Sequence, residues 1–302
     1  MARSLDRTTL AIAGPAIVGT ALSLGFAACG LQPPETPSTQ PVAPPAAPPQ
    51  PQPPVGSPPV APIAGYQLLW SDEFDGTSID PSRWHVWTGP RRDAVMTTDA
   101  LSVHDGVLHL VTSTDGGINH TGFLGTDGIF DATYGYFEAR IRFHGAPGQW
   151  CAFWLNSPTN GVPLGDPATA GVEIDVVEHR FVDDGGWQLK DYVQMTLNWD
   201  GYGPQKKSDE KVSLAPGGVP VQGEWHTYGV LWTDTGYTFS MDGVTLWTTN
   251  SAISKRSEWI QVTCEVLDAS WAGSIPTGGY GPAATSTTGM EVDWVRVWQR
   301  AP

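Results

Sequence analysis

Three carboxylates lie close together within one apolar run of this sequence. Glu173, Asp175 and Glu178 belong to the segment Gly171-Val-Glu-Ile-Asp-Val-Val-Glu-His179. The β-branched residues between them predict a strand rather than a helix. Because side chains alternate along a strand, Glu173 and Asp175 face one side, whereas Glu178 would face the other. A single β-bulge near Val176–Val177 would restore a common face, and we expect such a bulge here.

Three acids on one face of a strand indicate a catalytic site. Like charges at this spacing raise one another's pKa and destabilise a sheet. Two carboxyl groups with different pKa values are what the hydrolysis of a glycosidic bond requires. The alternative is a sheet edge that carries solvated acids or an occasional Ca²⁺ ligand. The rest of the chain favours catalysis.

The composition restricts both the ligand and the fold. The chain has 302 residues and a net charge of −15. This negative charge argues against nucleic acid, whose phosphates bind basic surfaces, and against an anionic membrane as the substrate. A neutral or cationic polymer is easier to accommodate. Helix-forming residues are sparse, whereas Gly, Thr, Val and Trp are abundant, which predicts an all-β fold.

Residues 1–29 have the pattern of a signal peptide, with an early positive charge and an apolar stretch from Leu10 to Ala28. Its end, Gly25-Phe-Ala-Ala-Cys29, resembles a bacterial lipobox, in which the cysteine is lipidated and becomes the mature N-terminus. Phe26 replaces the usual Leu. A plain secretory signal with an incidental cysteine, and an uncleaved anchor, are the alternatives. Each of them places the rest of the chain outside the cytoplasm.

A proline-rich segment follows, from residue 30 to residue 65. Fourteen of the 27 prolines lie in it, between Ala, Gln, Ser and Thr. Such a composition forms no core and stays extended and semi-rigid. We interpret it as a spacer between the anchor and a folded domain at residues 66–302.

The folded domain alternates short strand-like runs with turn residues. Tyr134–Phe143 alternates cleanly, Trp150–Leu155 is nearly all apolar, and Asp105-Gly106 is a two-residue hairpin turn. Many short strands with Gly and Asp turns predict a jelly-roll β-sandwich of two antiparallel sheets, with a concave cleft for the substrate.

Two cysteines remain if Cys29 is lipidated. Alternation directs both Cys151 and Cys264 toward the core of the domain. An extracytoplasmic compartment permits a disulfide, which requires adjacent strands. Two buried free thiols are the alternative. No histidine occupies a comparable strand position, so a nucleophilic cysteine is not indicated.

Ordered motifs across residues 66–299 resemble the family 16 glycoside hydrolases, the laminarinase-like endo-β-glycanases. In chain order the motifs are Trp70-Ser-Asp-Glu-Phe74, Tyr134-Gly-Tyr-Phe-Glu-Ala-Arg140, Trp150-Cys-Ala-Phe-Trp154, Glu173-Ile-Asp-Val-Val-Glu178, His226-Thr-Tyr228 with Trp232, and Val292-Asp-Trp-Val-Arg-Val297. The resemblance implies a retaining mechanism. Glu173 would be the nucleophile, Glu178 the general acid/base, and Asp175 the residue that holds the nucleophile's geometry and charge.

Tryptophans are the expected sugar contacts, because sugar rings stack their apolar faces on aromatic side chains. Trp150 and Trp154 are four apart on one strand and share a face, which is the catalytic face in the family. Trp199 and Trp271 follow neighbouring strands and are expected at the mouth of the cleft. Core packing is the alternative for any single tryptophan.

One departure from the family bears on the substrate. Laminarinase-like relatives commonly carry a histidine where this chain has Asn198, while His179 directly follows the acid/base. We expect both residues near the subsites of cleavage. The first expectation for the substrate is β-1,3-glucan, and β-1,3-galactan or another β-glycan is the alternative. A transglycosylase and a non-catalytic glycan-binding module are the competing function classes.

The resemblance also implies a structural Ca²⁺ on the side away from the cleft. Glu73, Gly106 and Asp293 match the positions of its ligands, partly through backbone carbonyls, and oxygen ligands suit Ca²⁺. The chemistry requires no cofactor. We expect a monomer whose partner is a polysaccharide, and which meets a membrane only through its lipid anchor.

Overall fold

The computed structural model describes residues 59–302, and the structural statements below concern these residues. The predicted signal peptide, Cys29 and most of the predicted spacer lie outside them. Within 59–302, no helix is both long and apolar enough to cross a membrane.

Strands form nearly all of the regular structure. They are β1 (Tyr66–Asp72), β2 (His85–Val86), β3 (Gly89–Arg91), β4 (Ala94–Met96), β5 (Leu101–His104), β6 (Val107–Val111), β7 (Ser113–Asp115), β8 (Ile118–Thr121), β9 (Phe123–Gly125), β10 (Gly135–His144), β11 (Gln149–Asn156), β12 (Glu173–Arg180), β13 (Tyr192–Trp199), β14 (Lys207–Leu214), β15 (Trp225–Thr233), β16 (Gly236–Met241), β17 (Val244–Thr249), β18 (Trp259–Val266) and β19 (Gly289–Arg300). The helical segments of the described chain are α1 (Pro167–Ala170) and two 3-10 turns, Thr98–Ala100 and Pro216–Gly218.

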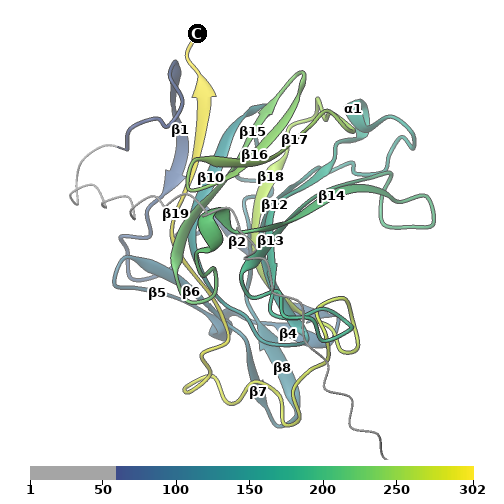
Figure 1. Cartoon of the computed structure of the whole chain (residues 1–302). Helices are drawn as coiled ribbons and strands as arrows, with labels where there is room; N and C mark the ends of the chain where they lie inside the picture. The colour runs from purple at the N-terminus through teal and green to yellow at the C-terminus, as the bar shows by residue number, and fades with distance from the viewer. Residues whose placement is uncertain (1–58) are drawn as a thin grey trace, which may run out of the picture. The chain divides into compact units, whose positions relative to one another are not determined.

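Two large sheets pack as a sandwich (Figure 1). One has the order β17-β16-β15-β10-β19-β6-β5, with β1 added beside β19, and the other has the order β14-β13-β12-β11-β18-β9-β2. The prediction of an all-β jelly roll is confirmed. The two antiparallel sheets of the predicted sandwich are present, and β3, β4, β8 and β7 form a third, small sheet beside them, in which β4 and β8 run parallel. These strands have three or four residues each, too few to show a periodic pattern.

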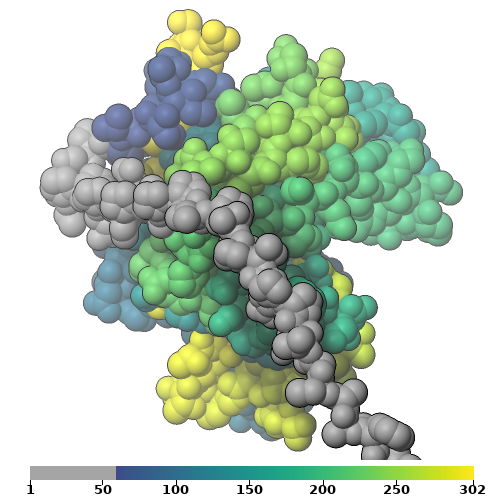
Figure 2. Space-filling view, in the orientation of Figure 1, coloured from purple at the N-terminus to yellow at the C-terminus, as the bar shows by residue number. Residues whose placement is uncertain are grey.

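The hydrophobic core lies between the two large sheets. Strand β10 supplies it with Phe137, Ile141 and Phe143, and β12 supplies Ile174 and Val177; all five are fully buried. Alternation along each strand therefore leaves every second residue on an outer face. Figure 2 shows the C-terminal end of β19 next to β1. The first and last strands of the described chain are thus hydrogen-bonded neighbours.

Two hairpin turns have consecutive residues in the left-handed region, and the first of them, Asp105-Gly106, is the turn that the sequence predicts. Asp105 and Gly106 have φ angles of 55° and 74°, and Asp242 and Gly243 have φ angles of 50° and 76°. Consecutive left-handed residues match the right-handed twist of the strands they join. The first turn joins β5 to β6, and the second joins β16 to β17.

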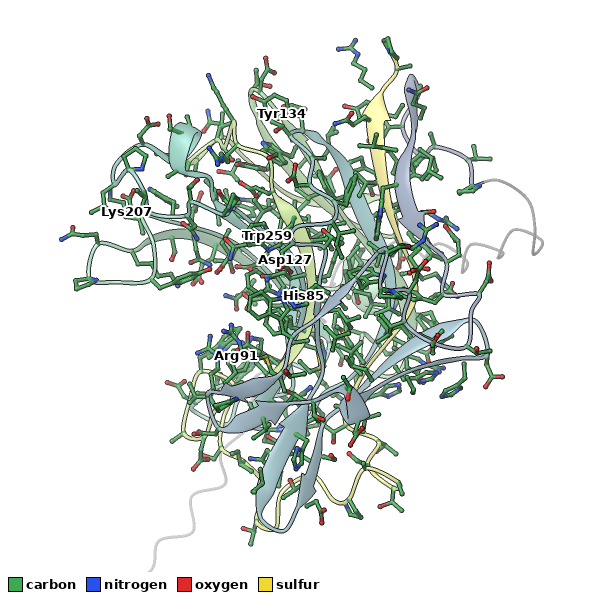
Figure 3. All side chains as sticks on the ribbon, turned by 180° about the vertical axis from the view of Figure 1, so that it is seen from behind. His85, Arg91, Asp127, Tyr134, Lys207 and Trp259 are labelled. Carbon is green, nitrogen blue, oxygen red and sulfur yellow. A yellow bond between two sulfur atoms is a disulfide. The ribbon has the colours of Figure 1, made fainter. Side chains whose placement is uncertain are left out.

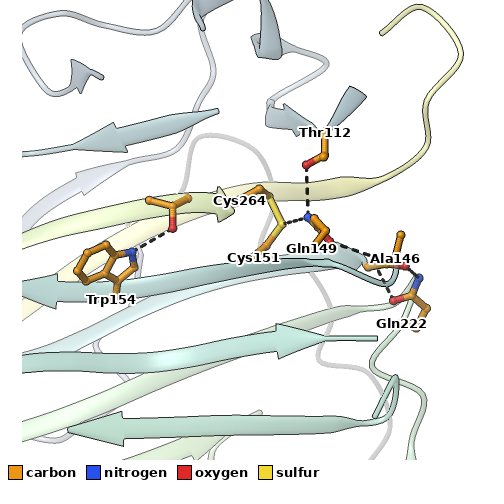
Figure 4. Close-up of a disulfide and its surroundings, with 9 residues drawn as sticks. Thr112, Ala146, Gln149, Cys151, Trp154, Gln222 and Cys264 are labelled. Carbon is orange, nitrogen blue, oxygen red and sulfur yellow. Dashed lines mark hydrogen bonds between the residues drawn. A yellow bond between two sulfur atoms is a disulfide. The ribbon is translucent and has the colours of Figure 1, made fainter. Parts of the chain in front are cut away.

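A disulfide joins Cys151 of β11 to Cys264 of β18 (Figure 4). The two residues are direct partners in the ladder, and both belong to the core. Of the two arrangements left open by the sequence, the structure has the bonded one. The bond ties together two strands that are 113 residues apart in the chain.

Removing this bond is expected to lower the free energy of unfolding. The double variant Cys151→Ala/Cys264→Ala should lose about 2–5 kcal/mol, because a long closed loop then gains entropy in the unfolded chain. Urea unfolding of the oxidised protein and of the variant checks this. A reducing agent should shift the midpoint of the wild type and leave that of the variant unchanged. Equal midpoints for the two oxidised proteins would contradict it.

Candidate active site

Strand β12 contains the predicted bulge. On its β11 side, Trp154 pairs with Asp175 and Phe153 pairs with Val177, so that Val176 has no partner. Val176 and Val177 are both buried in the core. The extra residue is therefore accommodated inside the sandwich, and it changes which side chains face out afterwards.

The β13 side of β12 shows the same shift. Asp175 pairs with Thr196 and Glu178 pairs with Gln194, so two residues of β12 stand opposite one residue of β13. Glu173 pairs with Asn198. As a result, the three carboxylates line the same cleft, which the sequence predicted through the bulge.

The cleft lies on the outer face of the sheet that contains β12 and has a volume of about 1100 Å³. In Figure 3, Lys207 and Arg91 lie on opposite sides of the hollow, and Trp259 lies farther in toward the sheet. Four neighbouring strands supply most of the lining. Its side chains include Trp150, Ala152, Trp154 and Asn156 of β11; Glu173, Asp175 and Glu178 of β12; Gln194, Thr196 and Asn198 of β13; and Trp259, Gln261, Thr263 and Glu265 of β18.

Glu173 accepts hydrogen bonds on both of its carboxylate oxygens. The Nδ2 of Asn198 donates to Oε1 over 2.9 Å, and the hydroxyl of Tyr202 donates to Oε2. Burial raises the pKa of Glu173, while the hydrogen bond from Tyr202, the charge of Lys206 and the hydrogen bond from Asn198 act in the opposite direction. These contacts stabilise the ionised carboxylate.

Glu178 has one hydrogen-bond donor, the Oγ1 of Thr196, at 3.2 Å from its Oε2. Burial, followed by the negative charge of Glu173, raises the pKa of Glu178 to about 8. The carboxyl group is therefore protonated at neutral pH. One group stabilised as a carboxylate and one held as an acid is the division of roles that retaining glycosidases use.

Asp175 lies between the two glutamates along the strand. Burial, then the charges of Glu178 and Glu173, raises its pKa well above the usual value. The same Nδ2 of Asn198 that contacts Glu173 also contacts the Oδ2 of Asp175, at 3.0 Å. The Oδ1 of Asn198 in turn accepts from the hydroxyl of Ser208 over 2.7 Å. Asp175 thus supports Glu173 through a shared amide, which fits the supporting role expected from the sequence.

Another buried carboxyl group, that of Glu258, lies behind the start of β12. Its Oε1 accepts a hydrogen bond from the backbone N–H of Val172 over 3.0 Å, directly before Glu173. Burial raises the pKa of Glu258 to about 8. The sequence does not indicate this residue, because nothing in its local run connects it to a strand 85 residues earlier.

Three of the four predicted tryptophans line the cleft: Trp150, Trp154 and Trp271. The indole of Trp154 donates to the Oγ1 of Thr263 over 3.1 Å (Figure 4). The rings of Trp150 and Trp271 meet edge to face, with centroids 5.3 Å apart. Trp199 does not line the cleft; it is partly buried and packs against the core. Since Asn198 faces the cleft, strand alternation turns the next residue inward.

The prediction that His179 lies near the subsites of cleavage is also wrong. It is 1% exposed, stacks on Phe143 with ring centroids 4.8 Å apart, and pairs its Nε2 with the carbonyl oxygen of Lys190 at 3.0 Å. Burial lowers its pKa to about 4. It directly follows Glu178, so alternation directs it into the core, and it cannot contact a substrate in the cleft.

Several residues that line the cleft are not among those predicted from the sequence. Arg91 and Arg92 both bond to the carboxylate of Glu265, the former at 2.7 Å. The guanidinium of Arg92 lies over the ring of Trp150, at 5.0 Å from its centroid. The adjacent arginines in an acidic chain were a signal that could have been used. Tyr202 stands between Gly201 and Gly203, a pattern that predicts only a turn.

Two of the three predicted calcium ligands, Glu73 and Asp293, are paired with arginines. Glu73 accepts two hydrogen bonds from Arg296, at 3.0 and 2.6 Å, and Asp293 accepts one from Arg140 at 2.7 Å. Gly106 lies in the β5–β6 turn. Nowhere in residues 59–302 do three or more His, Cys, Asp or Glu side chains form a group that could hold a metal. Both carboxylates are engaged by arginines, and calcium binding stays a prediction on which no chemical step depends.

Two carboxyl groups of unequal pKa on the floor of an open cleft are the pair that glycoside hydrolysis requires. The family model described as "Beta-porphyranase A-D, GH16 domain" matches residues 67–300. The chain therefore belongs to glycoside hydrolase family 16. The prediction of glycoside hydrolase family 16 is therefore confirmed.

Two curated relatives represent two substrate specificities. Beta-porphyranase B of Phocaeicola plebeius is 25% identical over 288 residues, which cover 81% of this chain and 88% of that protein. Glucan endo-1,3-beta-glucosidase A1 of Niallia circulans is 25% identical over 278 residues, which cover 81% of this chain and 39% of that protein. The chain thus spans well under half the length of the latter relative.

Solved structures show the same fold. Porphyranase B from Zobellia galactanivorans superimposes with a TM-score of 0.62 at 22% identity, covering 81% of this chain and 97% of that one. A laminarinase from Flavobacterium sp. UMI-01 superimposes with a TM-score of 0.61 at 19% identity, covering 77% and 100%. The two TM-scores establish a shared architecture. At these sequence identities the likeness is one of fold alone.

Proposed function

We propose that the chain is a retaining endo-β-glycosidase that hydrolyses a β-linked polysaccharide by double displacement. The observation that supports this proposal is that two carboxyl groups in one cleft differ in their hydrogen bonds and in their pKa. Glu173 receives two hydrogen bonds that favour its ionised form, whereas Glu178 has a pKa of about 8 and keeps its proton.

The reaction then follows in two steps. In the first, a carboxylate oxygen of Glu173 attacks the anomeric carbon while Glu178 gives its proton to the departing glycosidic oxygen. In the second, Glu178 takes a proton from water, the water oxygen bonds to the anomeric carbon, and the Glu173 carboxylate leaves. Two inversions at one carbon give net retention.

The activity is expected to fall as pH rises through about 8. Glu178 must be protonated in the first step, and its pKa in the free protein is about 8. Glu173 must be ionised, and its pKa is raised above the ordinary glutamate value, so activity is also lost on the acid side at a pH above that value. A pH profile of kcat/KM checks both limbs. An alkaline limb far below pH 7 would contradict the assignment of Glu178.

β-1,3-Glucan is the first candidate substrate, in keeping with the sequence motifs. The aromatic floor of Trp150, Trp154 and Trp271 suits the apolar faces of a neutral sugar backbone. The Niallia circulans relative is named a glucan endo-1,3-beta-glucosidase, which supports this candidate.

A specific observation favours a second candidate, a β-galactan with anionic substituents such as sulfate. Arg91 and Arg92 share one carboxylate, Glu265, which leaves one positive charge uncompensated within that group. Both arginines line the cleft. The matching family model and several relatives carry the name β-porphyranase, which supports this candidate too.

One experiment separates these candidates. The purified chain is incubated with laminarin, lichenan, β-1,3-galactan, agarose, porphyran and carrageenan, and released reducing ends and product sizes are measured. Activity on the sulfated galactans that Arg91→Gln reduces, with neutral polymers inert, selects the second candidate. Longer products from defined oligosaccharides would indicate a transglycosylase, and binding without turnover on every polymer would leave a glycan-binding module.

We further propose that the protein acts outside the cytoplasm as a monomer, tethered through a lipid on Cys29. The signal-like residues 1–29 and the lipobox-like sequence support this. Labelling cells with a radioactive fatty acid tests it: the label should enter the wild type and be absent from Cys29→Ser. Gel filtration of the soluble domain tests the oligomeric state.

A further inference from the structure

Tyr202 is the donor that reaches the second carboxylate oxygen of Glu173. Its hydroxyl donates to Oε2 of Glu173, and the Nδ2 of Asn156 donates to the same hydroxyl over 2.9 Å. The phenol proton is therefore directed at Glu173, because the remaining interaction of the oxygen is occupied by an amide donor. Asn198 holds the other oxygen.

The loop that carries Tyr202 is fixed at both ends. Asp200 is 4% exposed and accepts from the backbone N–H of Gly165 over 2.7 Å and from the Nζ of Lys207 over 2.8 Å. Asp200 and Gly201 both have left-handed φ angles, 64° and 74°. The backbone of Gly201 passes so close to Gly161 that a Cβ on Gly161 would lie 2.6 Å from it. This packing fixes the backbone from which the Tyr202 side chain projects.

We propose that Tyr202 is a catalytic residue of the second half-reaction, in which its hydroxyl stabilises the Glu173 carboxylate as this group leaves the anomeric carbon. The inference rests on the proposed retaining mechanism and deepens it. In that step the water oxygen bonds to the anomeric carbon, the bond to the Glu173 oxygen breaks, and the electron pair returns to the carboxylate. The proton lost by water goes to Glu178.

The phenol donates a hydrogen bond without giving up its proton. Desolvation of its hydroxyl, followed by the charge of Glu173, raises the pKa of Tyr202 above its ordinary value, although 62% of the residue is exposed, so the hydroxyl stays protonated throughout. The same hydrogen bond has opposite effects on the two steps. It lowers the electron density of Glu173 as a nucleophile in the first step, and it stabilises Glu173 as a leaving group in the second.

The variant Tyr202→Phe separates these effects, since it retains the ring and the loop and removes the donor. The substrate is the polymer that the wild type cleaves in the panel above, together with the matching 2,4-dinitrophenyl β-oligosaccharide. We expect kcat to fall about 10–100-fold, in line with the loss of a hydrogen bond to a charged group. KM should fall in parallel, because release from Glu173 becomes rate-limiting. A burst of dinitrophenol and a glycosyl-enzyme seen by intact-mass spectrometry should accompany this change.

The pH profile gives an independent readout. Because the Tyr202 hydrogen bond opposes the rise in the pKa of Glu173, the acid limb of kcat/KM should move to higher pH in Tyr202→Phe. Tyr280→Phe is the matched control. Its hydroxyl donates to the carbonyl of Pro147 over 3.0 Å, it does not line the cleft, and its kinetics should equal those of the wild type.

Two failures are distinguishable. A wild type inert on every polymer removes the proposed function itself. A wild type that is active, with a folded Tyr202→Phe variant that shows no glycosyl-enzyme and an unmoved acid limb, overturns the role of Tyr202 alone. An equal fall in kcat and kcat/KM without an accumulated intermediate overturns it as well, since a merely structural contact would give that result.

Discussion

Replacing Glu173 by Gly is expected to lower the rate of hydrolysis by about 10⁴-fold or more, as the loss of a covalent nucleophile does in other enzymes. Sodium azide should then restore turnover of an activated β-glycoside. The small anion occupies the space left by the Glu173 side chain and attacks the anomeric carbon directly. Because only one displacement takes place, the product is the α-glycosyl azide, whose configuration NMR identifies.

The control for this variant is Glu224→Gln, which changes an exposed acid in the turn before β15 and should leave the rate unchanged. A circular dichroism spectrum equal to that of the wild type establishes that Glu173→Gly folds. Full activity of this variant, or a β-glycosyl azide as the product, would show that Glu173 is not the nucleophile.

Replacing Glu178 by Gln is expected to lower kcat/KM about 10²–10⁴-fold on the polysaccharide, the usual effect of losing a general acid. The loss should be much smaller for the first step with a dinitrophenyl leaving group, which departs without a proton. The alkaline limb near pH 8 should disappear, because the group with a pKa of about 8 is gone. Azide should give a β-glycosyl azide with Glu178→Ala, since both displacements then occur.

The stability of Glu178→Gln provides a further check. The folded-state pKa of Glu178 is raised to about 8 from an ordinary value of 4.5. The contribution of this group to the free energy of unfolding is therefore greatest below the ordinary pKa. It is lost as the pH rises from the ordinary pKa to the folded-state pKa, because the unfolded chain ionises over that range. The neutral amide removes that dependence, so the melting temperature of the variant relative to the wild type should rise from pH 4 to pH 8. A parallel fall of both proteins would argue against a buried, protonated Glu178.

Local patterns in the sequence were sufficient to predict much of the fold and the centre of the site. The β-branched run around Glu173 predicted a strand, and the odd spacing of Glu178 predicted a bulge at Val176–Val177, since three acids on one face need the extra residue. The turn residues at Asp105-Gly106 predicted their hairpin. These features depend on residues a few positions apart, and such short-range preferences are present in the sequence itself.

Two errors came from not applying the same alternation further. His179 directly follows Glu178, and Trp199 directly follows Asn198, so each has to face the core when its neighbour faces the cleft. Adjacency in the sequence therefore does not imply proximity in the site. On a strand, adjacent side chains lie on opposite sides of the sheet.

The tertiary structure alone decided the contacts between distant segments. The loop at Tyr202 reaches Glu173, the pair Arg91–Arg92 meets Glu265 from the far end of the chain, and Cys151 is bonded to Cys264. The sequence by itself determined which residues face the cleft within each strand and that two glutamates on β12 share it. Which strands are neighbours depends on how all the apolar faces are buried together, a property of the whole chain that no local period encodes. The hydrogen bonds that make one glutamate a nucleophile and the other an acid depend on that order of strands.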